Sequence, residues 1–407
     1  MAVDMTGPGT SATGAFASLA ERVGGRRRGA HSGVGRKGGP FDGLCLSQLI
    51  PALLVVILGV ITIWSASLTI PEANFVSHLA GIALGLGAAF VIWRYDYRAL
   101  SNMTTALFVL ACVLMVLPRV PGLGYEGGLG MVGWVRLGPI RFQPSEPAKL
   151  VTIFLMASAC AQYNGKIESF RDYAKLCGTL LVPLLLILTL DLGTGLIIFF
   201  IGATVIICSG APRTWVLGTI ALIVAAAAFV IIESQIEGIP HILQDYQLKR
   251  LIVFVDPDVD PTGDGYNLRQ AMIAVGSGGF LGKGFGNASQ ALSGFVPEAQ
   301  TDFVFSLFAE QFGFVGSVLL LGLYAWMIFS TILIAMRMES TFSKLVLVGC
   351  VAMWTFQVLE NVGMCLGVMP ITGIPLPFVS YGSSSMVVQL AAVGIVQSVW
   401  RHRQKAA

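Results

Sequence analysis

Long apolar segments, separated by shorter polar connections, recur along most of the chain. A helix needs about 20 mostly apolar residues to cross the hydrocarbon core of a bilayer, which is ~30 Å thick. The pattern predicts ten membrane-spanning helices, at Leu46–Leu68, Val76–Trp93, Leu100–Leu117, Ala148–Gln162, Leu176–Leu190, Leu192–Cys208, Trp215–Ile232, Phe303–Ala335, Leu345–Val368 and Phe378–Trp400.

Composition agrees with a membrane protein. Hydrophobic residues make up 55% of the 407 residues and charged residues only 12%, whereas a soluble domain has roughly 25% charged residues. We therefore predict an all-α polytopic membrane protein. The seven cysteines and four histidines show no metal-type spacing, which argues against a zinc or haem site.

The distribution of Lys and Arg predicts the orientation. An even number of spans places both termini on one side, and that side also holds most basic residues of the short connections, such as Arg94, Arg98 and Arg337. Because cytoplasmic loops carry the excess of Lys and Arg, we predict that both termini are cytoplasmic. The large loop at 233–301 is then extracytoplasmic. The net charge of +3 does not indicate nucleic-acid binding.

The two ends of the chain are polar. Residues 1–44 are rich in Gly, Ser, Ala and Arg, a composition that cannot bury a core and predicts a disordered cytoplasmic tail. The transmembrane domain then covers residues 45–401, and residues 402–407 form a second cytoplasmic tail.

One carboxylate lies where the large loop enters an apolar segment. The stretch Phe295-Val-Pro-Glu-Ala-Gln-Thr-Asp-Phe303 places Asp302 at the mouth of the eighth span. An ionisable group at that depth is costly to desolvate, so it indicates chemistry or transport rather than packing.

Two further polar clusters precede helices. Pro144-Ser145-Glu146-Pro147 predicts a helix start with Ser145 as N-cap. Glu146 and Lys149 would share one face of that helix, either as a structural ion pair or as functional charges. In the second cluster, Asp191 either caps the sixth span or lines a polar cavity.

The large loop contains candidate phosphate ligands. Lys249 and Arg250 suit a phosphate-bearing ligand. The glycine-rich run at 276–286 either cradles phosphates with backbone N–H groups or provides flexibility. The acidic stretch at 256–265 lacks the glycine and glutamate of a calcium-binding EF-hand loop, so we expect turns there.

A broken segment at 370–385 separates the last two spans. Irregular backbone at membrane depth is tolerated only where protein or a watery cavity surrounds it. We therefore expect either a re-entrant element that lines a groove or a plain loop.

Five motifs in order resemble the SEDS family of bacterial cell-wall proteins (RodA, FtsW and SpoVE). They are Phe142-Gln-Pro-Ser-Glu146, Asp191-Leu-Gly-Thr194, Gly276-Ser-Gly-Gly279, Pro297–Phe303 and Thr372-Gly-Ile-Pro-Leu-Pro-Phe-Val-Ser-Tyr-Gly382. Within the family, Asp264-Gly-Tyr-Asn267 and Gly282-Lys-Gly284 look more like RodA.

The resemblance implies a peptidoglycan glycosyltransferase of the bacterial cytoplasmic membrane. It would polymerise lipid II at the outer face, in cell elongation or division, together with a class B penicillin-binding protein. Its other expected partners are undecaprenyl-linked glycan and membrane lipids. Asp302 matches the family's essential carboxylate. The candidate substrate-binding residues are Arg136, Gln143, Glu146, Lys149, Asp191, Lys249, Arg250, Lys283 and Ser380.

A mechanism follows as a hypothesis. Making a β-1,4 bond from an α-linked sugar diphosphate inverts the anomeric centre, so the reaction needs a base for the acceptor hydroxyl. We expect Asp302 to be that base. Lys149, Arg136, Lys249, Arg250 or a divalent cation (Mg²⁺ or Mn²⁺) would stabilise the departing diphosphate.

Two other functions compete with this one. Asp191 and Glu360 within or between spans also fit a flippase or transporter for lipid-linked precursors. A non-enzymatic scaffold that recruits the penicillin-binding protein is the third possibility. The polar loop lies on the predicted external side, and the cytoplasmic connections are short, which favours surface chemistry.

Overall fold

The structure, a computed structural model, describes residues 43–125, 133–137, 140–233, 250, 252–254 and 256–403. Residues 1–42 of the predicted tail, residues 234–249 of the large loop and the last four residues lie outside this part of the chain. Gly43 and Leu44, which were assigned to the tail, are described.

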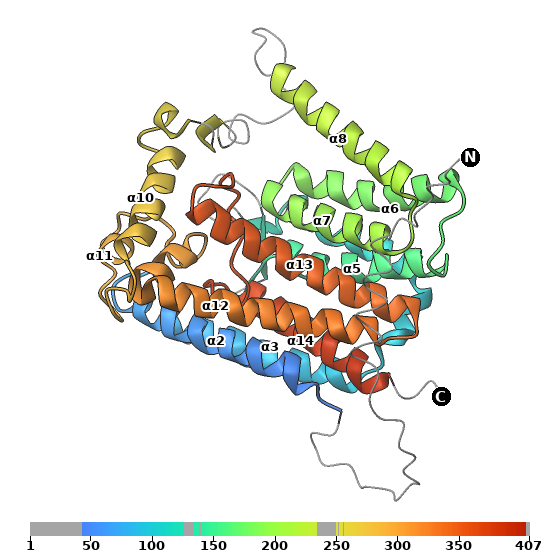
Figure 1. The fold of residues 1–407 in the computed structure, drawn as a ribbon, viewed down its shortest axis with the longest axis horizontal. Helices are drawn as coiled ribbons and strands as arrows, with labels where there is room; N and C mark the ends of the chain where they lie inside the picture. The colour runs from blue at the N-terminus through green and yellow to red at the C-terminus, as the bar shows by residue number, and fades with distance from the viewer. Residues whose placement is uncertain are drawn as a thin grey trace, which may run out of the picture. The chain divides into compact units, whose positions relative to one another are not determined.

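The described chain is mostly helical, and its helices lie side by side (Figure 1). The longer helices are α2 (Leu46–Ser67), α3 (Phe75–Arg94), α4 (Thr104–Val116), α5 (Ser145–Ala161), α6 (Phe170–Leu188), α7 (Leu192–Cys208), α8 (Arg213–Glu233), α10 (Asp264–Ser277), α12 (Val304–Met336), α13 (Thr341–Cys365) and α14 (Ser383–His402). Short 3-10 turns are η1 (Tyr97–Asn102), η2 (Leu117–Arg119) and η3 (Pro257–Val259), and α11 (Ser289–Leu292) is one turn.

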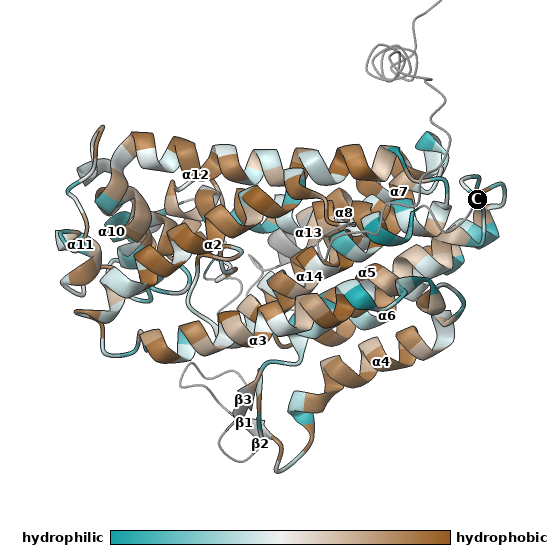
Figure 2. Ribbon diagram, turned by 90° about the horizontal axis from the view of Figure 1, so that it is seen from below, coloured by the Kyte–Doolittle hydropathy of each residue, from teal (hydrophilic) through white to brown (hydrophobic). Residues whose placement is uncertain are grey.

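Every predicted apolar segment overlaps one of these helices, and α10 is a further helix inside the large loop. Among the described residues, five helices are long and apolar enough to cross a membrane: α2, α3, α12, α13 and α14. Apolar residues dominate α2, α4 and α12 (Figure 2). The chain is therefore a multi-pass membrane protein.

A small sheet precedes α5 and was not predicted by the all-α pattern. It pairs β1 (Gly124–Tyr125), β2 (Trp134–Leu137) and β3 (Ile140–Phe142) in the antiparallel order β1-β2-β3. Strands this short give too weak a period to detect in a sequence rich in apolar runs.

The central helix is α13, which contacts α5, α7, α10, α12 and α14. Its Trp354 is fully buried and donates from Nε1 to Gln389 on α14 at 2.9 Å. Beside it, α3 and α14 approach so closely that a Cβ on Gly394 would lie 2.7 Å from the Cα of Ala89. Small residues of this kind allow membrane helices to pack backbone against backbone.

Helix α12 contains a break at Gly313, where φ is 64° and ψ is −163°. The glycine-rich run at 276–286 passes alongside and supplies replacement hydrogen bonds. The N–H groups of Lys283 and Gly284 donate to the carbonyls of Glu310 and Gln311, at 3.0 and 2.9 Å. In return, Phe314 N–H donates to the Gly279 carbonyl at 2.9 Å.

These contacts bear on both predicted roles of the glycine-rich run. Its N–H groups at 283 and 284 are used within the protein rather than held free for phosphate. Gly278 and Gly282 have a packing role, because a Cβ on either would lie 2.2 or 2.1 Å from a carbonyl oxygen of α12. Close packing against the broken helix requires them.

This packing predicts opposite effects for two neighbouring glycines at the end of α10. Gly278 has an ordinary helical φ of −66°, so in Gly278→Ala only the contact with the Ala309 carbonyl at 2.2 Å changes. We expect a loss of about 1–3 kcal/mol in the free energy of unfolding. Gly276 has open space around its Cβ position, and Gly276→Ala should be neutral or stabilising by up to about 1 kcal/mol.

Thermal unfolding of the purified variants in detergent, followed by tryptophan fluorescence, measures this difference. Equal melting temperatures for the two variants would show that Gly278 does not pack against α12.

Candidate active site around Asp302

Asp302 lies in a tight turn that leads into α12. The carbonyl of Glu298 accepts hydrogen bonds from the N–H groups of Thr301, Asp302 and Phe303, at 3.1, 3.1 and 3.2 Å. The Thr301 hydroxyl also donates to Glu298 Oε2 at 2.9 Å. Glu298 has a positive φ of 51°, which a non-glycine residue adopts at a cost in energy. The turn is therefore held by its own backbone.

The three carbonyls of this turn are bound by distant parts of the chain. The Gln300 carbonyl accepts from Tyr381 N–H at 2.8 Å, and the Thr301 carbonyl accepts from the Ser380 hydroxyl at 2.6 Å. The Asp302 carbonyl accepts from Asn361 Nδ2 at 2.7 Å. Ser380, predicted to bind substrate, here fixes the turn instead, and its role in substrate binding stays a prediction.

The segment between α13 and α14 packs directly against Asp302. A Cβ on Gly373 would lie 3.0 Å from Asp302 Oδ2, and Gly373 has a φ of +73°. Next to it, the Thr372 hydroxyl donates to Oε1 of the buried Glu360. Most of residues 371–380 are buried without regular structure, which agrees with the re-entrant interpretation rather than with a surface loop.

The surroundings of Asp302 make its carboxyl group a weaker acid than usual. Burial, and then the negative charges of Glu298 and Asp191, raise its pKa to about 7, although the positive charge of Arg250 acts in the opposite direction. The side chain is nevertheless only partly buried. A carboxylate with a pKa near neutral pH is suited to take up a proton during a reaction.

Asp191 is the N-cap of α7. This confirms the first of its two predicted roles, capping a helix or lining a polar cavity. Its carboxylate accepts from Thr194 N–H at 3.1 Å and from the Thr194 hydroxyl at 2.6 Å. Its charge also reaches Asp302. A Cβ on Gly193 would lie 2.8 Å from the Thr372 carbonyl, so the start of α7 adjoins the segment that covers Asp302.

Among the candidate basic residues that the structure describes, Arg250 is the one whose positive charge lowers the pKa of Asp302. Its Nε lies 3.7 Å from Asp264 Oδ2 at the start of α10. Arg136 lies on β2, with its guanidinium 5.9 Å from the centre of the Tyr125 ring. Lys249 lies outside the described residues.

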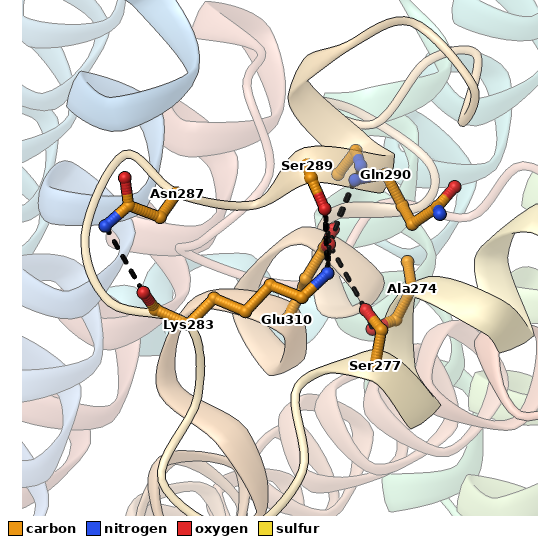
Figure 3. A network of polar contacts seen from close by, with 8 residues as sticks. Ala274, Ser277, Lys283, Asn287, Ser289, Gln290 and Glu310 are labelled. Carbon is orange, nitrogen blue, oxygen red and sulfur yellow. Dashed lines mark hydrogen bonds and ion pairs between the residues drawn. The ribbon is translucent and has the colours of Figure 1, made fainter.

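Lys283 belongs to a different cluster (Figure 3). Its ammonium lies 2.6 Å from Oε1 of Glu310, whose side chain is fully buried in α12. Glu310 also accepts from the N–H groups of Gln290 and Ala291, at 2.9 and 3.0 Å. Lys283 thus fastens the glycine-rich run and α11 to α12, and its role in substrate binding stays a prediction.

Glu146 and Lys149 form the predicted ion pair at the start of α5. Lys149 Nζ lies 2.8 Å from Glu146 Oε1, and both side chains are buried. The Gln143 carbonyl accepts from Glu146 N–H at 3.1 Å. The prediction that Ser145 is the N-cap was wrong by one residue, because α5 begins at Ser145 and Pro144 occupies the cap.

No group of three or more His, Cys, Asp or Glu side chains in the described part of the chain is placed to hold a metal ion. The carboxylates near Asp302 are instead engaged with Thr194, Thr301 and Thr372. We therefore derive no step through a metal from this geometry.

Comparison with known proteins decides the family. Residues 46–405 match the model of the FtsW/RodA/SpoVE cell cycle proteins. The chain is 33% identical to the peptidoglycan glycosyltransferase MrdB of Escherichia coli strain K12, over 88% of this chain and 94% of that protein. It is also 33% identical to the stage V sporulation protein E of Bacillus subtilis, over 88% and 97%.

The chain belongs to the FtsW/RodA/SpoVE family.

Solved structures of the family share its fold. A chain of a peptidoglycan synthase complex that coordinates polymerization and crosslinking superimposes with a TM-score of 0.75 and 30% identity, covering 89% of this chain and 99% of that one. The rod shape determining protein RodA of Thermus thermophilus gives a TM-score of 0.66 and 28% identity, covering 90% and 99%.

Sequence reasoning gave no individual role to several residues of this site. Glu298 and Gly373 lie next to Asp302 in space, Asn361 binds the Asp302 carbonyl, and Thr372 binds Glu360. Asn361 did carry a signal, since an amide inside an apolar span needs a hydrogen-bond partner. The partner itself lies 59 positions away in the chain, which no local pattern indicates.

The buried pair at the start of α5 generates a stability prediction. Lys149→Met leaves the Glu146 carboxylate buried without its cation, which should cost about 3–5 kcal/mol. The double variant Glu146→Gln/Lys149→Met should recover most of that loss. A matched control is Lys175→Met, which breaks an exposed pair with Asp172 of the same spacing and should cost at most about 1 kcal/mol.

Melting temperatures of the purified proteins in detergent would check this. If the double variant were as unstable as Lys149→Met, the loss would come from side-chain packing and not from the unpaired charge.

Proposed function

We propose that this protein is a peptidoglycan glycosyltransferase that polymerises lipid II, with Asp302 as the general base. The observation that carries the proposal is the fixed, half-buried Asp302 carboxylate with a pKa near 7 at the entrance of α12. The names of the relatives support the reaction class, since they include peptidoglycan glycosyltransferases.

The chemistry requires one proton transfer and one displacement. The acceptor's 4-hydroxyl oxygen attacks the anomeric carbon of the α-linked donor, and its proton passes to the Asp302 carboxylate. The new β-1,4 carbon–oxygen bond forms while the bond from the anomeric carbon to the diphosphate breaks. The diphosphate leaves with the electron pair, so the anomeric centre is inverted and no covalent sugar–enzyme intermediate is needed.

The leaving diphosphate needs positive charge nearby. Arg250 is the cation best supported for this role, because its charge acts on Asp302. Lys149 is fully buried against Glu146, so it would have to be uncovered before it touched substrate. Arg136, Lys249 and a divalent cation (Mg²⁺ or Mn²⁺) stay candidates for the same task.

The proposed topology places this chemistry at the outer face of the bacterial cytoplasmic membrane. We infer ten spans, cytoplasmic termini and an external loop at 233–301 from the Lys/Arg bias. Helix α12 is broken at Gly313, and its part after the break, residues 314–336, is about 35 Å long at 1.5 Å per residue, which is enough to cross the ~30 Å core of a bilayer. Its first turns, next to Asp302, would then lie near the outer surface.

A class B penicillin-binding protein is the proposed partner. Support comes from the structural neighbour, which belongs to a synthase complex that couples polymerization to crosslinking. The buried Glu360 within α13 favours one alternative, a flippase for lipid-linked precursors, because intramembrane carboxylates often mark transport pathways.

Product analysis separates these functions. Purified full-length protein in detergent, incubated with labelled lipid II with and without its partner, should yield long glycan strands. A flippase would instead move labelled lipid II across vesicle membranes without making polymer. No polymer with any partner would overturn the proposal.

The pKa of Asp302 predicts how the rate depends on pH. Above about pH 7 the carboxyl group is ionised and can accept a proton; as the pH falls through about 7 it becomes protonated, and kcat should fall with it. Asp302→Asn should abolish polymerisation at every pH. Asp258→Asn, which changes an exposed carboxylate paired with Arg269, should behave like the wild type.

The measurement is the initial rate of polymerisation at pH values from about 5.5 to about 8.5, a range that extends to both sides of the expected pKa. Asp302 would be excluded as the base if Asp302→Asn made polymer at the wild-type rate.

A further inference from the structure

Asn361 is a fully buried amide on α13 that binds two separate parts of the site. Its Nδ2 donates to the Asp302 carbonyl at 2.7 Å and to the Ile374 carbonyl at 2.8 Å. Because both partners are carbonyl oxygens, which only accept, the NH₂ group must face them, and its two hydrogens are both used.

These two bonds hold the backbone at Asp302 close to the segment at 370–382, which packs against it. Ile374 follows Gly373, whose Cβ position lies 3.0 Å from Asp302 Oδ2. One side chain therefore fixes the backbone on each side of this contact. The other two carbonyls of the turn are held by Ser380 and Tyr381, which belong to the same covering segment.

The Asn361 amide is only partly satisfied. Its Oδ1 atom is buried and has no hydrogen-bond partner among the described residues, which costs energy. Gln357 on the same helix also has a buried atom without a partner, Nε2, so what sets Asn361 apart is its pair of bonds to the Asp302 and Ile374 carbonyls.

We propose that Asn361 is a positioning residue for the Asp302 base. It holds the turn at 298–303 against the segment at 370–382, so that the carboxylate stays within hydrogen-bond reach of the acceptor hydroxyl. This inference rests on the proposed function. Asn361 acts through the backbone of Asp302 and touches no reacting atom.

The chain offers a matched control on the same helix. Gln357 lies one turn earlier on α13 and is also fully buried. Its Oε1 accepts from Gln389 Nε2 at 3.0 Å, away from the Asp302 turn. Asn361→Leu and Gln357→Leu thus both replace a buried amide with an apolar side chain, but only the first releases Asp302.

The experiment measures kcat and KM for lipid II with the full-length protein and its partner, together with melting temperatures. A displacement of about 1 Å at a reacting group costs about 10²-fold in rate. Asn361→Leu should therefore lower kcat about 100-fold and leave KM within about threefold, whereas Gln357→Leu should keep kcat within about threefold. Equal losses of kcat in the two variants would overturn the inference.

A second pair of variants decides the matter if Asn361→Leu does not fold. Ser380→Ala removes the hydrogen bond to the Thr301 carbonyl and should lower kcat about tenfold at similar KM. Its control, Ser398→Ala, removes a buried hydroxyl that donates to the Tyr95 carbonyl at 2.9 Å, and should leave kcat unchanged. Equal kcat values for the two variants would reject the positioning role.

Asp302→Asn in the same assay separates this inference from the proposed function. Wild-type polymerisation by Asp302→Asn would overturn the function itself. An inactive Asp302→Asn, combined with equal effects of Asn361→Leu and Gln357→Leu, would overturn only the role of Asn361.

Discussion

The capture of three consecutive carbonyls, at residues 300, 301 and 302, is the constraint on which the rest of the site depends. A turn inside a membrane domain has little water to satisfy its backbone, so each of its polar groups needs a partner from the protein. Here Tyr381, Ser380 and Asn361 supply those partners. The same bonds that satisfy the backbone also fix the position of the Asp302 backbone.

The break in α12 follows the same rule. A helix interrupted at Gly313 loses its regular hydrogen bonds, and the glycine-rich run replaces them from outside the helix. The buried Glu310 then binds Lys283 and the start of α11, which keeps the run in place (Figure 3). The loop before Asp302 and the helix after it are thereby joined into one unit, and both ends of the turn at 298–303 are held.

The positions of the apolar helices followed directly from the sequence, because each helix coincides with a continuous run of apolar residues. The capping role of Asp191 and the pairing of Glu146 with Lys149 were also predictable, since three positions separate the partners. The sheet around β2 and the helix α10 were missed, as their periods are short or weak. Lys283 was assigned to substrate by its chemistry, but its partner Glu310 lies 27 positions away.

The sequence by itself determined that this chain crosses a membrane several times and carries one carboxylate at the entrance of α12. Composition and local spacing suffice for both, because hydrophobicity and charge act residue by residue. Only the tertiary structure decided that Asn361, Ser380 and Gly373 contact the Asp302 turn and that Lys283 does not. Those contacts join segments far apart in the chain, and they depend on how the helices pack rather than on any repeating pattern.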